Sequence, residues 1–191
     1  MRPILLGLTG GRNVGKSSIA DVLVERHGFF RAHVFDGGKA AGFSFLSRYV
    51  GPRKARRMVW GDLKDRPCPE LPGGVAPRFF FEKLGRFMGV DGLGVEWTLG
   101  LELSRAKREA DGRPIVFESV VYEAPFFQGA GGFLARVVRP GHQGPVGIET
   151  DAAQARIRAD GQIVNGGTLA DLEAEVSRFL DLYARWRLAA A

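Results

Sequence analysis

The chain has 191 residues, of which 45% are hydrophobic and 25% charged, which is typical of one globular domain or of one domain with a sizeable insertion. Its single cysteine, Cys68, excludes an intramolecular disulfide and fits a reducing, cytoplasmic location. The apolar runs fall short of the roughly 18 residues that a membrane span needs, so no membrane partner is expected. The 27 basic residues exceed the 21 acidic ones, and the resulting net charge of +6 favours a polyanionic ligand.

Short apolar runs alternate with segments of helical spacing along the chain. The predicted buried strands are 4–8, 30–35, 115–117, 133–138 and 162–164, and the predicted helices are 17–27, 39–49, 79–87, 95–110 and 122–128. A last helix is predicted after Thr168, because Asp171 follows it at the spacing of a capping box. Alternating strands and helices are typical of an α/β fold with three layers, in which a parallel sheet of about five strands lies between helices.

Residues 51–111 interrupt this alternation with helical material that prolines punctuate and that is rich in basic and aromatic residues. We therefore expect a single domain, 1–191, with a helical insertion at about 51–111 that covers an edge of the sheet. Aromatic and basic residues do not recur at the spacing of a known nucleic-acid-binding module, so no nucleic-acid partner is expected. A homodimer is compatible with this organisation.

One motif between the first predicted strand and helix carries the chemistry. The residues Gly10, Gly11, Arg12, Asn13, Val14, Gly15, Lys16 and Ser17 match the P-loop pattern G-x-x-x-x-G-K-[ST]. The glycines let successive backbone N–H groups surround a phosphate, and the following helix adds its positive N-terminal dipole. Lys16 is predicted to reach the β- and γ-phosphates of ATP, and the Ser17 hydroxyl to bind Mg²⁺.

A magnesium site of this kind usually includes a carboxylate at the end of a neighbouring strand. Two residues are candidates: Asp36, after the second predicted strand, and Glu118, after the third. For each of them, capping of the next turn is the competing interpretation.

From this motif outward, the sequence resembles the P-loop nucleoside monophosphate kinases, and in particular the phage-type deoxynucleoside monophosphate kinases. The segments that carry the resemblance are GDLKDRPCPELPGGVAPRFFFEKLG, YEAPFFQGAGGFLARVVRPG and ADGQIVNGGTLADLEAEV, which occur in the family's order. The start, GLTGGRNVGKSSIADVL, also resembles dephospho-coenzyme A kinase. The resemblance implies a P-loop NTPase fold.

The resemblance further implies transfer of the γ-phosphoryl group of ATP to a nucleoside or deoxynucleoside 5'-monophosphate, giving the diphosphate. It implies that ATP is contacted by Ser18 beside the P-loop and by Asn165 and Gly167 near the adenine, and that Arg139 acts in catalysis next to a short lid at about 140–158. The acceptor-side residues are expected to be Asp36, Lys39, Asp62, Lys64, Arg78, Arg86 and Trp97. For Arg86 two interpretations stay open: a replacement for a cation that the family carries elsewhere, and a surface residue beside the insertion.

The sequence also departs from the family on the acceptor side. Phe117 and Ser119 stand where the family has Asp-x-Arg, so the arginine that would grip the acceptor phosphate is missing. Val90 likewise replaces a polar residue. Two alternatives therefore stay open: a dephospho-coenzyme A kinase, and a nucleotide-binding protein that has lost catalysis.

Overall fold

The computed structural model of the chain describes residues 4–142 and 149–189. The chain divides into two compact units: Met1–Val34 together with Leu103–Ala191, and Phe35–Glu102. The expectation of one domain with an insertion at about 51–111 stays a prediction, although the second compact unit both begins and ends earlier than this segment, at Phe35 and Glu102. In the described parts of the chain, no helix is long and apolar enough to cross a membrane.

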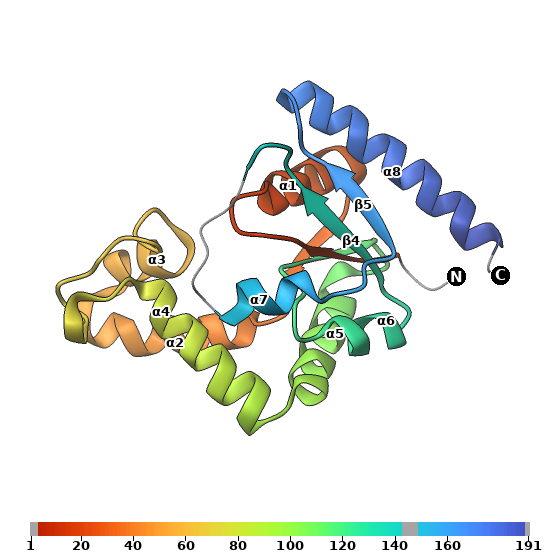
Figure 1. The fold of residues 1–191 in the computed structure, drawn as a ribbon. Helices are drawn as coiled ribbons and strands as arrows, with labels where there is room; N and C mark the ends of the chain where they lie inside the picture. Colours follow the sequence, from red (N-terminus) through yellow and green to blue (C-terminus); the bar gives the residue numbers. More distant parts are fainter. Residues whose placement is uncertain (1–3, 143–148, 190–191) are drawn as a thin grey trace. The chain divides into compact units, whose positions relative to one another are not determined.

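The first unit is built on a parallel sheet of five strands in the order β2-β3-β1-β4-β5, which confirms the predicted α/β fold (Figure 1). The strands are β1 (Leu5–Thr9), β2 (Phe30–His33), β3 (Ile115–Glu118), β4 (Phe133–Val138) and β5 (Gly161–Val164). Because β1 lies in the middle and pairs with both β3 and β4, its side chains are buried throughout. The segment that follows β1 therefore starts from a fixed point at the carboxyl edge of the sheet.

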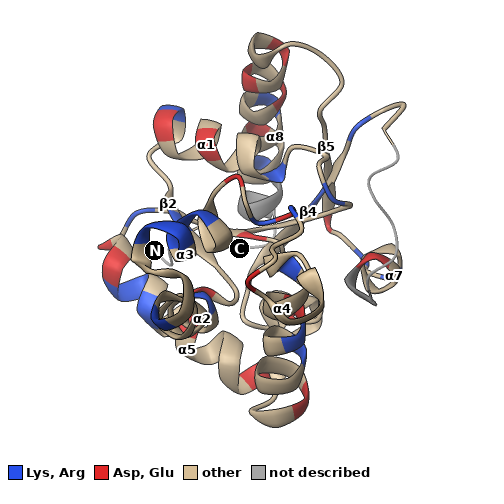
Figure 2. Ribbon diagram, turned by 90° about the vertical axis from the view of Figure 1, so that its left-hand side faces the viewer, with Lys and Arg blue, Asp and Glu red and all other residues tan. Residues whose placement is uncertain are grey.

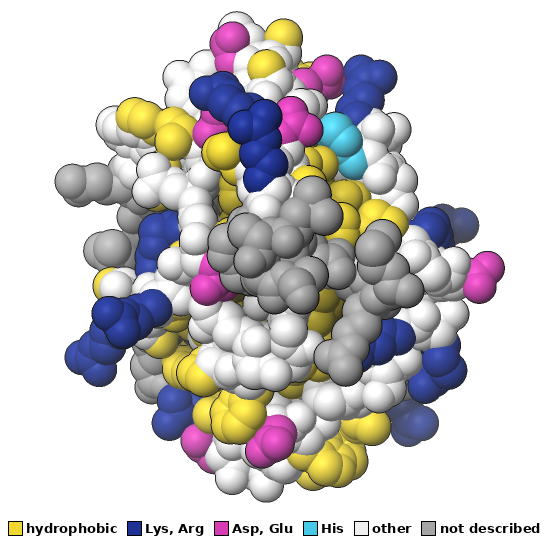
Figure 3. All heavy atoms as spheres, turned by 90° about the vertical axis from the view of Figure 1, so that its right-hand side faces the viewer, with side chains coloured by type: hydrophobic (Ala, Val, Ile, Leu, Met, Phe, Trp, Pro, Cys, Tyr) yellow, Lys and Arg dark blue, Asp and Glu magenta, His cyan; other side chains and the backbone are white. Residues whose placement is uncertain are grey.

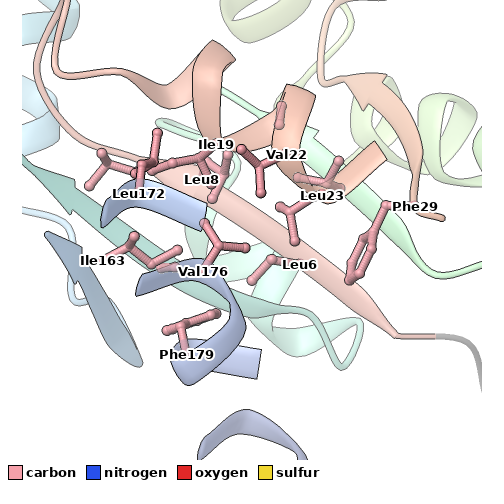
Figure 4. Packing of buried hydrophobic residues seen from close by; sticks show 14 of the residues in the cluster. Leu6, Leu8, Ile19, Val22, Leu23, Phe29, Ile163, Leu172, Val176 and Phe179 are labelled. Carbon is pink, nitrogen blue, oxygen red and sulfur yellow. The ribbon is translucent and has the colours of Figure 1, made fainter. Parts of the chain in front are cut away.

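Two helices, α1 (Lys16–His27) and α8 (Leu169–Ala189), pack against one face of this sheet. Their apolar residues form a single cluster with the strands, and Figure 4 shows its centre: Leu6, Leu8, Ile19, Val22, Leu23, Phe29, Ile163, Leu172, Val176 and Phe179. Burying one such side chain contributes about 1.5–3 kcal/mol. The cluster therefore anchors the start of α1, which carries the end of the glycine-rich motif.

The opposite face of the sheet is covered by α6 (Ala124–Gly129) and by the part of α5 (Val95–Ala110) that belongs to this unit (Figure 1). The rings of Phe117 and Phe127 meet edge to face, with centroids 5.7 Å apart. Gly7 leaves room for this contact, because a Cβ atom there would lie 2.8 Å from the Phe127 ring. β1 is thus fixed from both faces.

The start of α8 has the capping box that the sequence predicts. The Thr168 N–H donates to the Asp171 carboxylate over 2.8 Å, and the Asp171 N–H reaches the Thr168 hydroxyl oxygen over 3.3 Å. The Thr168 hydroxyl also donates to the Asp171 carboxylate over 2.7 Å, and this bond, followed by the one from the Thr168 N–H, holds the pKa of Asp171 below its usual value. The cap fixes where α8 begins, and with it the loop of residues 165–168.

The second unit is helical. It contains α2 (Asp36–Val50), α3 (Pro52–Trp60), the short 3₁₀ turn η1 (Pro72–Gly74), α4 (Pro77–Leu84), the π-helical segment η2 (Gly85–Gly92) and the first part of α5. Its core gathers Leu46, Ala55, Met58 and Cys68, with Phe80 and Phe81 beside them. The basic residues of α3, which stand out in Figure 2, include Lys54 and Arg57, which pair with Glu70 and Asp62 respectively.

The sequence did not predict every element of the chain. α3 was expected only as unspecified helical material, and α7 (Glu149–Ala155) falls inside the predicted lid at 140–158. Residues 143–148 of that lid lie outside the described residues. On the face in Figure 3, basic side chains form several separate groups.

Glu123, directly before α6, is a buried acidic residue whose ionisation should affect stability. Burial raises the pKa of its carboxyl group above the usual 4.5, and bonds from backbone N–H groups, including Val121 at 3.1 Å, oppose the rise only in part. The folded protein therefore binds this proton more tightly than the unfolded chain. The stabilisation that protonated Glu123 contributes is lost as the pH rises from about 4.5 through the pKa that the group has in the folded protein.

We predict that Glu123→Gln is more stable than the wild type at pH 7, because the amide keeps an acceptor for the Val121 N–H without carrying a charge. The free energy of unfolding should increase by about 1.4 kcal/mol for each tenfold difference in proton affinity between the folded protein and the unfolded chain, and the increase should vanish below pH 4.5. Urea unfolding at pH 4 and pH 7 measures it. The exposed Glu25→Gln in α1 is the control, and a Glu123→Gln protein less stable than wild type at pH 7 would contradict the prediction.

Candidate functional site

The P-loop lies between β1 and α1, as predicted, and two of its glycines are required by its shape. Gly10 has φ 131° and Gly15 has φ 100°, values that disfavour any side chain. A Cβ atom on Gly10 would collide with the Val137 carbonyl oxygen of β4, and one on Gly15 with the Asn165 amide. The loop is therefore pressed against β4 on one side and against the loop after β5 on the other.

Lys16, the first residue of α1, folds back over this loop. Its ammonium group donates to the carbonyl oxygens of Gly10 and Gly11, over 2.7 and 2.6 Å. The positive charge of Lys16 therefore lies against the loop, beside the backbone N–H groups of the first turn of α1. This combination of a cation and a helix N-terminus suits a phosphate group.

Ser17 and Glu118 meet at the carboxyl edge of the sheet. The Ser17 hydroxyl donates to Glu118 Oε2 over 2.8 Å, and the Glu118 side chain is only 12% exposed. A hydroxyl and a carboxylate are hard oxygen ligands of the kind that Mg²⁺ prefers, so these two residues fit the predicted metal. The described residues contain no group of three or more His, Cys, Asp or Glu side chains placed to hold a metal ion.

Asp36, the other carboxylate predicted for the metal, belongs to the second unit. β2 ends at His33, two residues earlier than expected, and Asp36 is the first residue of α2. Its carboxylate lies 3.9 Å from the ammonium group of Lys39, one turn further along the helix. The role of Asp36 toward a metal or an acceptor stays a prediction.

Two charged residues that the sequence analysis missed complete the surroundings of Glu118. Arg31, on β2, pairs through its Nε with Glu118 and through its Nη1 with Asp21 of α1. Burial lowers the pKa of the Arg31 guanidinium, but the bonds and charges of Glu118 and Asp21 outweigh burial and raise it overall. The signal for Arg31 was present in the sequence: it is a charged residue inside an apolar strand.

The loop at residues 165–168, predicted to lie near the adenine of ATP, contacts the P-loop directly. The Asn165 amide donates to the Val14 carbonyl oxygen over 2.9 Å. Gly167 lines a surface pocket whose wall consists of Val164, Gly166, Gly167, Asp171, Glu175 and Arg178. The structure thus brings Asn165 to the P-loop, whereas Gly167 lines a pocket formed by β5, the loop after it and α8.

Two arginines bond to α7, the described helix of the predicted lid, and to the residues that follow it. Arg12, in the P-loop, pairs with Asp151 of α7 at 3.1 Å, with both side chains largely buried. Arg136, on β4, donates to the carbonyl oxygens of Gln154 and Ile157 at the end of α7. α7 is therefore attached both to the phosphate loop and to the sheet.

The remaining predicted residues on the ATP side are exposed. Ser18 lies in the first turn of α1, one residue after Ser17. Arg139 directly follows β4, and its carbonyl oxygen accepts from the His142 N–H over 3.1 Å. Their predicted contacts with ATP remain predictions.

The other acceptor-side residues lie in the second unit, where three of them have local ionic partners. Arg57 grips Asp62 with two bonds of 2.9 and 2.8 Å, which lowers the pKa of Asp62 to about 2. Arg78 bonds to Asp65 in the same two-pronged way, and Arg86 bonds to Asp91 over 2.8 Å. The Lys64 carbonyl oxygen accepts from the Arg78 N–H over 2.9 Å, and Trp97 is 54% exposed.

The departures at the end of β3 have a structural explanation. Phe117, where the family that the sequence resembles has an acidic residue, is fully buried against Phe127. Ser119 has φ 58°, in the left-handed region that few side chains adopt. An aromatic ring thus fills space in the core at position 117.

Solved structures of other proteins are similar to this chain. The chain is similar to TT1252 from Thermus thermophilus, with a TM-score of 0.52 and 19% identity over 95% of this chain and 98% of that one. It is also similar to the dephospho-CoA kinase from Campylobacter jejuni, with a TM-score of 0.43 and 13% identity over 95% and 97% of the two chains. At these identities, we take the likeness to TT1252 as evidence of the fold alone.

The sequence comparisons add no family. No protein-family model matches the chain, and no curated protein matches it.

Two constraints act on Gly15: its positive φ angle and its close approach to the Asn165 amide. A matched substitution at a second glycine separates them. Gly28, after α1, has φ 68° but open space around its Cα atom, so Gly28→Ala should cost only the backbone strain, about 1–2 kcal/mol. We predict that Gly15→Ala loses more stability, because its methyl group also displaces Asn165. Urea unfolding measures the difference, and equal losses in the two variants would show that Asn165 does not press on the loop.

Proposed function

We propose that this protein is an ATP-dependent kinase that transfers the γ-phosphoryl group of ATP to a nucleoside or deoxynucleoside 5'-monophosphate. The observation that carries the proposal is the phosphate loop, with Lys16 over its mouth and Ser17 against Glu118. In the reaction, an acceptor phosphate oxygen bonds to the γ-phosphorus while the bond from that phosphorus to the β–γ bridging oxygen breaks. The products are the nucleoside diphosphate and ADP.

The residues of the first unit have distinct tasks in this proposal. The backbone N–H groups of the P-loop bind the phosphates, and the Lys16 ammonium exchanges its carbonyl partners for β- and γ-phosphate oxygens. Ser17 and Glu118 would hold Mg²⁺, which neutralises charge on the transferring group. Asn165 keeps the P-loop and the adenine-side loop in contact, so both ends of ATP meet a prearranged surface.

The acceptor would be recognised by the second unit. Lys39, Lys64, Arg78 and Arg86 supply cations there, and the exposed Trp97 supplies a ring on which a base can stack. Because Arg78 and Arg86 already hold Asp65 and Asp91, an acceptor phosphate would have to compete with these carboxylates. This competition favours a doubly charged phosphate over a neutral acceptor.

A second candidate function follows from Phe117. A buried ring at the end of β3 cannot grip an acceptor phosphate, which favours a protein that binds ATP without transferring its phosphoryl group. The two candidates differ in one outcome. The kinase converts ATP to ADP when its acceptor is present, whereas the second candidate binds ATP and phosphorylates no acceptor.

We predict that purified protein converts Mg²⁺-ATP and one member of a panel of nucleoside monophosphates, deoxynucleoside monophosphates and dephospho-coenzyme A into ADP and a phosphorylated acceptor. Lys16→Ala should lower the rate about a hundredfold or more, because a cation on the developing charge is lost. Mass spectrometry of the products measures both. The control is Lys107→Ala, an exposed lysine on α5, which should keep the wild-type rate.

Each outcome of this assay has a definite meaning. Phosphorylated dephospho-coenzyme A in place of a nucleoside diphosphate would replace the proposed acceptor. ATP binding with no product from any acceptor would favour the second candidate. Full activity in a folded Lys16→Ala protein would contradict the role assigned to the P-loop.

A further inference from the structure

We infer that Arg31 is a positioning residue for the metal site: it holds the Glu118 carboxylate in the orientation in which that carboxylate accepts the Ser17 hydroxyl proton. This inference rests on the proposed function, because it assigns a purpose to Arg31 only if Ser17 and Glu118 bind Mg²⁺ together with ATP. It adds a residue of β2 to a site otherwise built from α1 and β3.

The strand register brings Arg31 to this place. β2 and β3 pair in parallel with Arg31 opposite Val116 and His33 opposite Glu118. Arg31 and Glu118 are therefore diagonal neighbours, and their side chains point to the same face of the sheet. On that face, Ser17 and Asp21 lie one turn apart on α1, so one side of the helix presents both residues to the strands.

The guanidinium of Arg31 is held at two points. Its Nε donates to Glu118 Oε1, and its Nη1 donates to Asp21 Oδ1. Because the guanidinium is planar and rigid, fixing it at Asp21 also fixes the direction from which it bonds Glu118. Asp21 acts as the outer anchor, with a side chain 54% exposed, whereas Glu118 is 12% exposed and lies on the inner side.

The two oxygens of Glu118 consequently have separate partners. Oε1 receives Arg31, and Oε2 receives the Ser17 hydroxyl over 2.8 Å. Since the hydroxyl proton is committed to Oε2, the lone pairs of Ser17 Oγ are available to a cation. Without Arg31, the Glu118 carboxylate could rotate about its side-chain bonds, and the orientation of the Ser17 hydroxyl would no longer be fixed.

A role in stability alone leaves the bond from Arg31 to Asp21 unexplained. Arg31 and Asp21 are each more than a third exposed, so the pair between them contributes little to folding, whereas the pair between Arg31 and the 12% exposed Glu118 also stabilises the fold. Residues that hydrogen-bond to metal ligands, in contrast, commonly change metal affinity about 10–100-fold when they are removed. The two roles therefore make different predictions for metal binding.

The test is binding of a non-hydrolysable ATP analogue, with an imido group between the β- and γ-phosphates, to the full chain by titration calorimetry. The affinity is measured with EDTA and then over a series of Mg²⁺ concentrations. We expect Arg31→Met to leave the affinity in EDTA within about twofold of wild type. The Mg²⁺ concentration that half-saturates the enhancement should rise about tenfold.

Three further variants make the result specific. Arg26→Met removes an arginine of α1 that pairs with Glu173 away from the site, and it should keep the wild-type Mg²⁺ dependence. Arg31→Lys restores the charge without the planar two-point grip, so it should recover only part of the loss. Asp21→Asn loosens the outer anchor and should raise the half-saturating Mg²⁺ concentration by less than Arg31→Met does. It also tests the inference if Arg31→Met fails to fold.

The outcomes separate this inference from the proposed function. If the wild type binds the analogue equally well with and without Mg²⁺, the metal site and the inference both fall. If the wild type shows the enhancement and both Arg31→Met and Asp21→Asn keep it, only the role of Arg31 is overturned. A lower half-saturating Mg²⁺ concentration in Arg31→Met would also overturn it, because Arg31 would then merely repel the cation.

Discussion

The close fit of the phosphate loop between β4 and the loop after β5 is the constraint on which the rest of the site depends. Gly10 and Gly15 adopt positive φ angles where a methyl group would collide with Val137 and Asn165. The loop can hold this shape because β1, at the centre of the sheet, and α1, packed in the main core, fix its two ends. A phosphate cradle of this kind needs rigid supports, since its backbone N–H groups must converge on one point.

Charge at the carboxyl edge of the sheet is arranged around this loop in alternating signs. Lys16 lies over the mouth, Glu118 is bonded to Ser17, and Arg31 joins Glu118 to Asp21. A polyanionic ligand with a divalent cation fits such an arrangement, because positive and negative groups each find an opposite partner. The second unit carries its own ion pairs, of which Arg57–Asp62 and Arg78–Asp65 are two-pronged.

The sequence predicted the parallel sheet, the phosphate loop and the capping box of α8, because each depends on short-range patterns: buried runs, fixed glycine spacing, and a Thr and an Asp three residues apart. It also predicted Glu118 as a metal ligand from its position after a strand, and the structure brings Glu118 into contact with Ser17. Arg31 was missed because its role depends on a register between two strands that are far apart in the chain. The tie between Arg12 and Asp151 was missed for a similar reason, since it spans 139 residues.

Binding of the phosphates of ATP by the loop of residues 10–17 can be measured by backbone amide NMR of ¹⁵N-labelled protein. On addition of Mg²⁺-ATP, we expect the largest changes in chemical shift at the amides of residues 11–17, with smaller ones at Glu118 and Asn165. Changes confined to the second unit, or no changes in the P-loop at saturating ATP, would contradict it.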